Sequence, residues 1–177
     1  MKTQLVEPTE GIELVPQILH LKKILVPIDF SETSKKAFQY ALRFAEQFNC
    51  EIILLNVVEP ISPMVFEPVS PMGGAPLAAD AFSNTEHELS AAKRDLAMLS
   101  AEAHTNGAHS VNSCVRTGHA PNEITKAAKD LDIDLIIIST HGYTSWRHLC
   151  IGSTAERVVR TAPCPVLVVR EKEHEFI

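Results

Sequence analysis

The chain has 177 residues, of which 45% are hydrophobic and 21% charged, as is typical of one globular domain. Its formal net charge of -6 leaves no surplus of lysine and arginine to neutralise a phosphate backbone, so we expect no binding of DNA or RNA. No segment has the long apolar run of a signal peptide or a membrane span, and we expect a cytoplasmic protein that does not bind membranes.

The first half of the chain predicts a strand, a helix and a second strand. Residues 23–28 are apolar and rich in β-formers, and Ser31 then marks the start of a helix with apolar residues along one face. Residues 51–58 are apolar almost without interruption, which indicates a strand buried on both faces of a parallel sheet. Residues 59–83 contain five prolines and a Gly-Gly pair and predict a long loop.

The second half continues the alternation. The predicted elements are a helix from about Asn84 to His104, a strand at 110–116, a helix opening at Pro121, a strand at 134–139, a helix at 152–161 and a strand at 165–169. Five strands alternating with four helices predict a single α/β domain with an open, doubly wound parallel sheet. Ligands bind such sheets at the carboxyl ends of strands where the strand order reverses, so the loops after the first and fourth strands are the candidate site.

The loop after the fourth predicted strand has the composition of an anion site. Gly142 and Gly152 are separated by nine residues, and Gly152 opens a helix with Ser153 and Thr154 behind it. Glycine lets backbone N–H groups approach an anion, and a helix start adds unpaired N–H donors. No lysine follows Gly152, so this is not a Walker loop, and the dinucleotide fingerprint would follow the first strand instead. From the residues alone, the two glycines could equally mark a turn and a helix start.

Four segments resemble successive blocks of the universal stress protein family: KKILVPIDFSETSKKAFQYALRFA, EIILLNVV, DLIIISTHG and GSTAERVVRTAPCPVLVVR. ATP-binding members carry a glycine, two residues, a glycine, nine residues, and then glycine with serine or threonine. Gly142, Gly152 and Ser153 fit that pattern, whereas Ser139 stands in place of its first glycine. The resemblance implies a Rossmann-like sheet of the adenine nucleotide alpha hydrolase type, with strand order 3-2-1-4-5.

The same resemblance implies that ATP, together with Mg²⁺ or Mn²⁺, is the ligand. Asp29 would accept hydrogen bonds from the ribose or the adenine, or would cap the following helix, and both roles can hold. Pro27 and Ile28 would form an apolar wall, and the backbone of Val57 would meet the adenine. The candidate nucleotide-binding residues are Pro27, Ile28, Asp29, Val57, Ser139, His141, Gly142, Arg147, Gly152, Ser153 and Thr154.

Two of these residues carry open alternatives. The Arg147 guanidinium could pair with the terminal phosphate, or it could be a solvated surface charge. His141 could act as a general base, but the sequence shows no Ser/His/Asp or paired-carboxylate arrangement, and members of the family are mainly binding proteins. We therefore expect no catalytic residue. The histidines and the four cysteines lack ligand spacing, so we expect no metal site of the protein's own.

The resemblance leaves three functions open. The first is an ATP-binding regulatory protein of the stress response, whose output is a protein partner that the sequence does not identify. The second is a nucleotide-free dimeric interaction module with a chaperone-like role, and the third is a slow ATPase or autophosphorylating protein.

The apolar last strand, Pro165 to Val169, lies at a sheet edge in the family's topology and would pair with a second copy in a homodimer. Alternatively, the N-terminal extension would cover this edge. We expect that extension at residues 1–20, the universal stress protein domain at residues 21–172, and a tail at residues 173–177.

Overall fold

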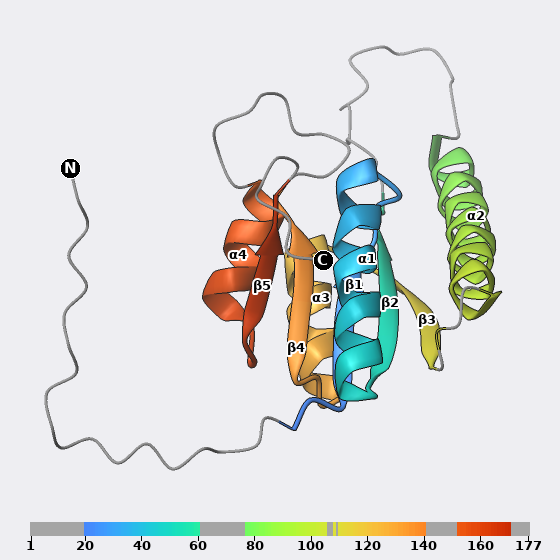
Figure 1. Ribbon diagram of the computed structural model, residues 1–177. Helices are drawn as coiled ribbons and strands as arrows, with labels where there is room; N and C mark the ends of the chain where they lie inside the picture. Colours follow the sequence, from blue (N-terminus) through green and yellow to red (C-terminus); the bar gives the residue numbers. More distant parts are fainter. Residues whose placement is uncertain (1–19, 61–76, 106–107, 109, 141–151, 171–177) are drawn as a thin grey trace, which may run out of the picture.

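A computed structural model describes residues 20–60, 77–105, 108, 110–140 and 152–170. These residues form one five-stranded parallel sheet in the order β3-β2-β1-β4-β5, with four helices (Figure 1). The elements are β1 (Lys23–Pro27), α1 (Glu32–Phe48), β2 (Glu51–Val58), α2 (Leu77–Thr105), β3 (Val111–Thr117), α3 (Ala120–Asp130), β4 (Leu135–Ser139), α4 (Ser153–Thr161) and β5 (Val166–Val169). The predicted doubly wound α/β fold and its strand order are confirmed.

The helices form two layers, one on each face of the sheet. Helices α1 and α2 pack on one face, and α3 and α4 pack on the other. In β1, successive side chains point to opposite faces, so Ile24 and Val26 contact the first layer and Leu25 the second. All three are fully buried, which explains why the strand is continuously apolar.

Helix α1 has a start and an end that the sequence specifies. Ser31 is the N-cap, and its hydroxyl accepts a hydrogen bond from the backbone N–H of Ser34 at 3.2 Å. The helix ends at Phe48, and the C-cap residue Asn49 has a φ of 51°, a left-handed conformation that asparagine tolerates. The stretch between them places Ala37 and Ala41 in the core against the sheet.

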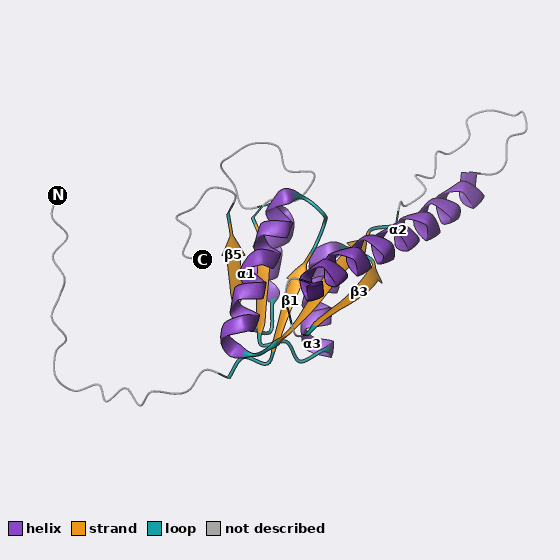
Figure 2. Cartoon of the chain, turned by 45° about the vertical axis from the view of Figure 1, so that its right-hand side comes forward, coloured by secondary structure: helices purple, strands orange, loops and turns teal. Residues whose placement is uncertain are grey.

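Helix α2 is longer than predicted. The sequence predicted a loop over residues 59–83 and a helix from Asn84, whereas α2 already begins at Leu77 and extends past the sheet (Figure 2). The last helix-breaking residue of that stretch is Pro76, and the alanines and leucine behind it are good helix formers. Residues 61–76 lie outside the described part of the chain. Of the described helices, α2 included, none is long and apolar enough to cross a membrane.

The strand order reverses next to β1. This strand pairs in parallel with β2 on one side and with β4 on the other. The chain enters β2 through α1 on one face of the sheet and later reaches β4 through α3 on the opposite face. The strands β1 and β4 therefore lead to helices on different faces of the sheet, and the space at their carboxyl ends is where this fold can hold a ligand.

Candidate functional site

A cavity of about 500 Å³ lies at the carboxyl ends of β1, β2 and β4, beside the starts of α3 and α4. This volume is within the range of small-molecule sites. The predicted residues that line it are Pro27, Ile28, Asp29, Val57, Ser139, Gly152, Ser153 and Thr154. The other predicted residues, His141, Gly142 and Arg147, lie outside the described residues. The structure thus brings the residues that follow β1 next to the end of β4 and the start of α4.

One part of the cavity is apolar. Pro27, Val57 and Ile138 contribute from the ends of three adjacent strands, while Ile124 of α3 and Ala155 of α4 close it from the helix layer. Ile138 and Ile124 were not predicted as site residues, because a buried isoleucine in a strand or helix has the pattern of an ordinary core residue. This part of the cavity can hold a flat, apolar ring.

The start of α4 is open toward the cavity. Its N-cap residue, Gly152, has no side-chain cap, and the Gly152 N–H itself donates to the carbonyl oxygen of Thr140 at 2.7 Å. The first intrahelical bond runs from the N–H of Glu156 to the oxygen of Gly152 at 3.0 Å. The backbone N–H groups of Ser153, Thr154 and Ala155 therefore have no acceptor within the helix. They and the two hydroxyl groups lie where an anion would be stabilised by the helix dipole.

Two backbone conformations bear on the glycine pattern. Gly152 has φ of -59° and ψ of 148°, which any residue can adopt, so its backbone does not require glycine. Ser139, in place of the family's first glycine, is the last residue of β4, is 8% exposed and lies in register with Val169. Because Ser139 has no positive φ, a serine is compatible with the local geometry.

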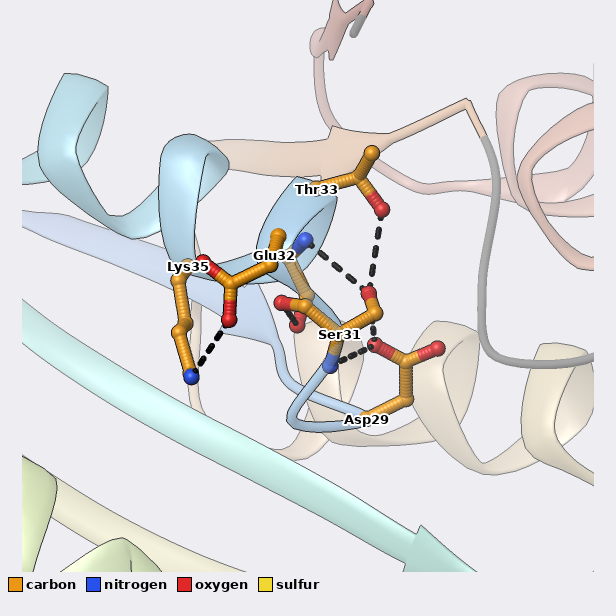
Figure 3. Close-up of polar contacts among 6 residues, drawn as sticks. Asp29, Ser31, Glu32, Thr33 and Lys35 are labelled. Carbon is orange, nitrogen blue, oxygen red and sulfur yellow. Dashed lines mark hydrogen bonds and ion pairs between the residues drawn. The ribbon is translucent and has the colours of Figure 1, made fainter.

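Asp29 reaches the cavity from the turn between β1 and α1 (Figure 3). Its Oδ1 accepts hydrogen bonds from the backbone N–H of Ser31 at 3.1 Å and from the Ser31 hydroxyl at 2.6 Å. The Ser31 hydroxyl has only one proton, so the Thr33 hydroxyl, 3.0 Å away, is the donor in their mutual contact. Ser31 rather than Asp29 is therefore the side-chain cap of α1, and it fixes the Asp29 carboxylate in place.

Two charged residues of the cavity were missed by the sequence analysis. Glu59 directly follows β2, and Arg157 lies one helical turn after Ser153 on α4. Each has the appearance of a solvated surface charge in the sequence. The signal that could have found them is position: Glu59 follows a strand next to β1, and Arg157 shares a helix face with Ser153 through the i,i+4 spacing.

The described site is equipped for binding. It combines carboxylates at Asp29 and Glu59, a cation at Arg157 and the N–H donors of α4 around an apolar floor. Within the described residues, no three His, Cys, Asp or Glu side chains are grouped as metal ligands.

Comparison with known proteins places residues 20–170 in the universal stress protein family. A universal stress protein of Methanocaldococcus jannaschii is 32% identical over 155 residues, which are 87% of this chain and 85% of that protein. The structure of UspA from Lactobacillus plantarum matches with a TM-score of 0.73 and 26% identity, over 86% of this chain and all of that one. A universal stress protein in complex with cAMP matches with a TM-score of 0.62 and 19% identity, over 87% of this chain and all of that one, a likeness that shows the fold.

Proposed function

This chain belongs to the universal stress protein family, and from that membership we propose that it binds ATP or another adenine nucleotide and acts in the stress response through nucleotide-dependent contacts with a partner. The observation that carries the proposal is the open start of α4, where three backbone N–H groups and the hydroxyls of Ser153 and Thr154 border the cavity. Such a helix start stabilises phosphate groups through its unpaired donors and its dipole.

The rest of the cavity matches the remaining parts of a nucleotide. The phosphates lie at the start of α4, and the base occupies the apolar part between Pro27 and Val57. Asp29 then accepts hydrogen bonds from the sugar or the base, because Ser31 holds its carboxylate at the cavity. The same fold holds an adenine nucleotide in the universal stress protein described in complex with cAMP.

Among the described residues that line the cavity, Arg157 is the one with a cationic side chain. Arg157 lines the cavity, and helical side chains lean toward the N-terminus of their helix, so we expect its guanidinium near the start of α4. It can neutralise part of a di- or triphosphate. A divalent ion such as Mg²⁺ or Mn²⁺ would neutralise another part, since these ions bind mainly through the phosphates of a nucleotide and few protein groups.

We further propose that two copies pair through β5, as the sequence predicted. β5 is the last strand of the sheet order, and three of its four residues, Val166, Leu167 and Val168, are only half-buried. An apolar edge strand is a template for pairing, and an antiparallel pair about a two-fold axis covers both edges. The nucleotide would change the surface that this dimer presents to its partner.

The experiment is an analysis of nucleotides in the purified protein, followed by titration. A denatured extract should contain adenine nucleotide, and calorimetry of the emptied protein should detect ATP binding with Mg²⁺ present. A protein that carries no nucleotide and binds none would leave the dimeric interaction module as the function. Release of phosphate during the titration would instead favour a slow ATPase.

A further inference from the structure

Glu59 connects the carboxyl end of β2 to the start of α3 across the edge of the cavity. Its Oε1 accepts a hydrogen bond from the backbone N–H of Ala120 at 2.7 Å, and these residues are 61 positions apart in the sequence. The N-cap residue of α3, His119, makes no side-chain cap. Glu59 therefore caps α3 from a different strand, and the helix dipole favours a carboxylate at that position.

The two helix starts at the cavity consequently differ in charge. At α4 the N-cap residue Gly152 provides no side-chain cap, whereas at α3 a carboxylate of the protein already occupies the helix end. Both Glu59 and Ala120 line the cavity. A second anion near Ala120 would face the negative charge of Glu59, and like charges in contact oppose binding. A hydroxyl or amino group would find an acceptor there, since a carboxylate has more lone pairs than one backbone N–H uses.

We propose that Glu59 is a specificity-determining residue, which makes the α3 end of the cavity accept hydrogen-bond donors of the ligand and reject anionic groups. The inference rests on the proposed function and narrows its ligand class. The favoured ligand is a nucleoside whose phosphate groups are all at the 5′ position, bound at the start of α4. In the proposed placement the sugar lies between the base at Pro27 and Val57 and the phosphates at α4. A further phosphate on the sugar ring that reaches Ala120 would face the Glu59 carboxylate and is rejected.

The test compares two ligands that differ only in this phosphate. Calorimetry at fixed ionic strength measures adenosine 5′-monophosphate and 3′-phosphoadenosine 5′-phosphate on the wild type, Glu59→Gln, Glu59→Ala and Glu46→Gln. Glutamine keeps an acceptor for the Ala120 N–H but removes the charge. Glu46→Gln makes the same charge change on an exposed side chain of α1, which packs on the other face of the sheet.

We expect the wild type to bind the monophosphate more tightly. In both Glu59 variants the ratio of the two dissociation constants should fall by about tenfold or more, and Glu46→Gln should keep the wild-type ratio. Wild-type ratios in both Glu59 variants would overturn the inference while leaving the proposed function in place. A wild type that binds neither nucleotide would remove the proposed function and this inference with it.

Hydrogen exchange of the Ala120 amide gives a readout that needs no nucleotide. Exchange should accelerate in Glu59→Ala, where the cap is lost, and stay near the wild-type rate in Glu59→Gln. Amides of β2 serve as the reference for an intact fold, because this strand is paired on both sides. An Ala120 amide that exchanges equally in all three proteins would show that Glu59 does not occupy the helix start, and would overturn the inference.

Discussion

Gly152 donates its backbone N–H to the carbonyl oxygen of Thr140 at 2.7 Å. This bond joins the residue that follows β4 directly to the N-cap residue of α4. Thr140 is 4% exposed, and its own N–H donates to the oxygen of Val169. The bond therefore fixes the start of α4 relative to the ends of β4 and β5. Because the Gly152 N–H is already used in this bond, the backbone donors available to a ligand are those of the following residues.

The first prediction concerns this bond. Gly152→Pro should lower the free energy of unfolding by about 1–3 kcal/mol, because proline lacks the N–H and leaves a buried carbonyl oxygen without this donor. The Gly152 φ of -59° is close to the value that proline requires, so the ring itself adds little strain. Gly152→Ala keeps the N–H and is the matched control. Urea unfolding of both variants is the measurement, and equal stabilities would contradict the role of the bond.

The second prediction concerns the nucleotide. Gly152→Val should weaken ATP binding by about tenfold or more, since a branched side chain at the cavity would crowd the phosphates beside the start of α4. The backbone angles of Gly152 are accessible to valine, so the fold should remain. Calorimetry on the wild type, Gly152→Ala and Gly152→Val should give a graded loss. Unchanged affinity in the valine variant would exclude the start of α4 as the phosphate site.

The sequence predicted the inner strands β1, β2 and β4 well because burial on both faces leaves an unambiguous apolar run. β2 is the clearest case, since the predicted bounds and the bounds in the structure are both residues 51–58. The predicted start of α2 was too late, because the prolines and glycines of residues 59–83 predicted a loop over the whole segment. The residues after Pro76 are good helix formers and already belong to the helix. A helix start that lacks a capping residue, such as that of α2, has no sequence signal as clear as the apolar run of a buried strand.

The site was predictable where it depends on position along the chain. Asp29 and Ser139 lie at strand ends, and Gly152 opens a helix, so topology and the family pattern were sufficient to bring them together. The position of Glu59 after β2 could have placed it at the cavity, but its role as a cap was not predictable, because its partner Ala120 is distant in sequence and is reached only after β3 has paired with β2. A charged residue after a strand has no signal that separates a cap from a solvated side chain.

The third prediction concerns the proposed dimer. Val168→Asp should weaken it, because an antiparallel pair of β5 strands would bring two carboxylates into a dry contact without partners. Val159→Asp is the matched control, since Val159 is 48% exposed on α4 and lies outside the edge strand. Light scattering at micromolar concentration measures the assembly, and thermal unfolding checks both variants for folding. A monomeric wild type, or a Val168→Asp protein that dimerises as well as the parent, would place the interface elsewhere or remove it.

The last prediction concerns the thiols of Cys50, Cys114 and Cys164. Burial raises the pKa of each above its ordinary value of 9.0, because the thiolate loses its hydration in the folded chain. Asp134 adds to this effect at Cys50 and Cys164. The raised pKa makes the folded state bind more protons than the unfolded state once the pH passes the ordinary thiol range. The contribution to stability is therefore complete below that range and declines as the pH rises above 9.0.

Two measurements test the raised thiol pKa and the expected loss of stability at high pH. Iodoacetamide should alkylate these three thiols far more slowly in the native protein than in urea at the same pH, and a Cys150→Ser background leaves only the three to be followed. The free energy of unfolding should fall as the pH rises above 9.0 in that background. The free energy should fall less steeply in Cys114→Ala. At Cys114 burial raises the thiol pKa, and the charge of Arg116 opposes that rise. Native alkylation at the unfolded rate would contradict the burial of Cys50 and the partial burial of Cys114 and Cys164. Equal slopes in the two proteins would exclude Cys114 from the pH dependence.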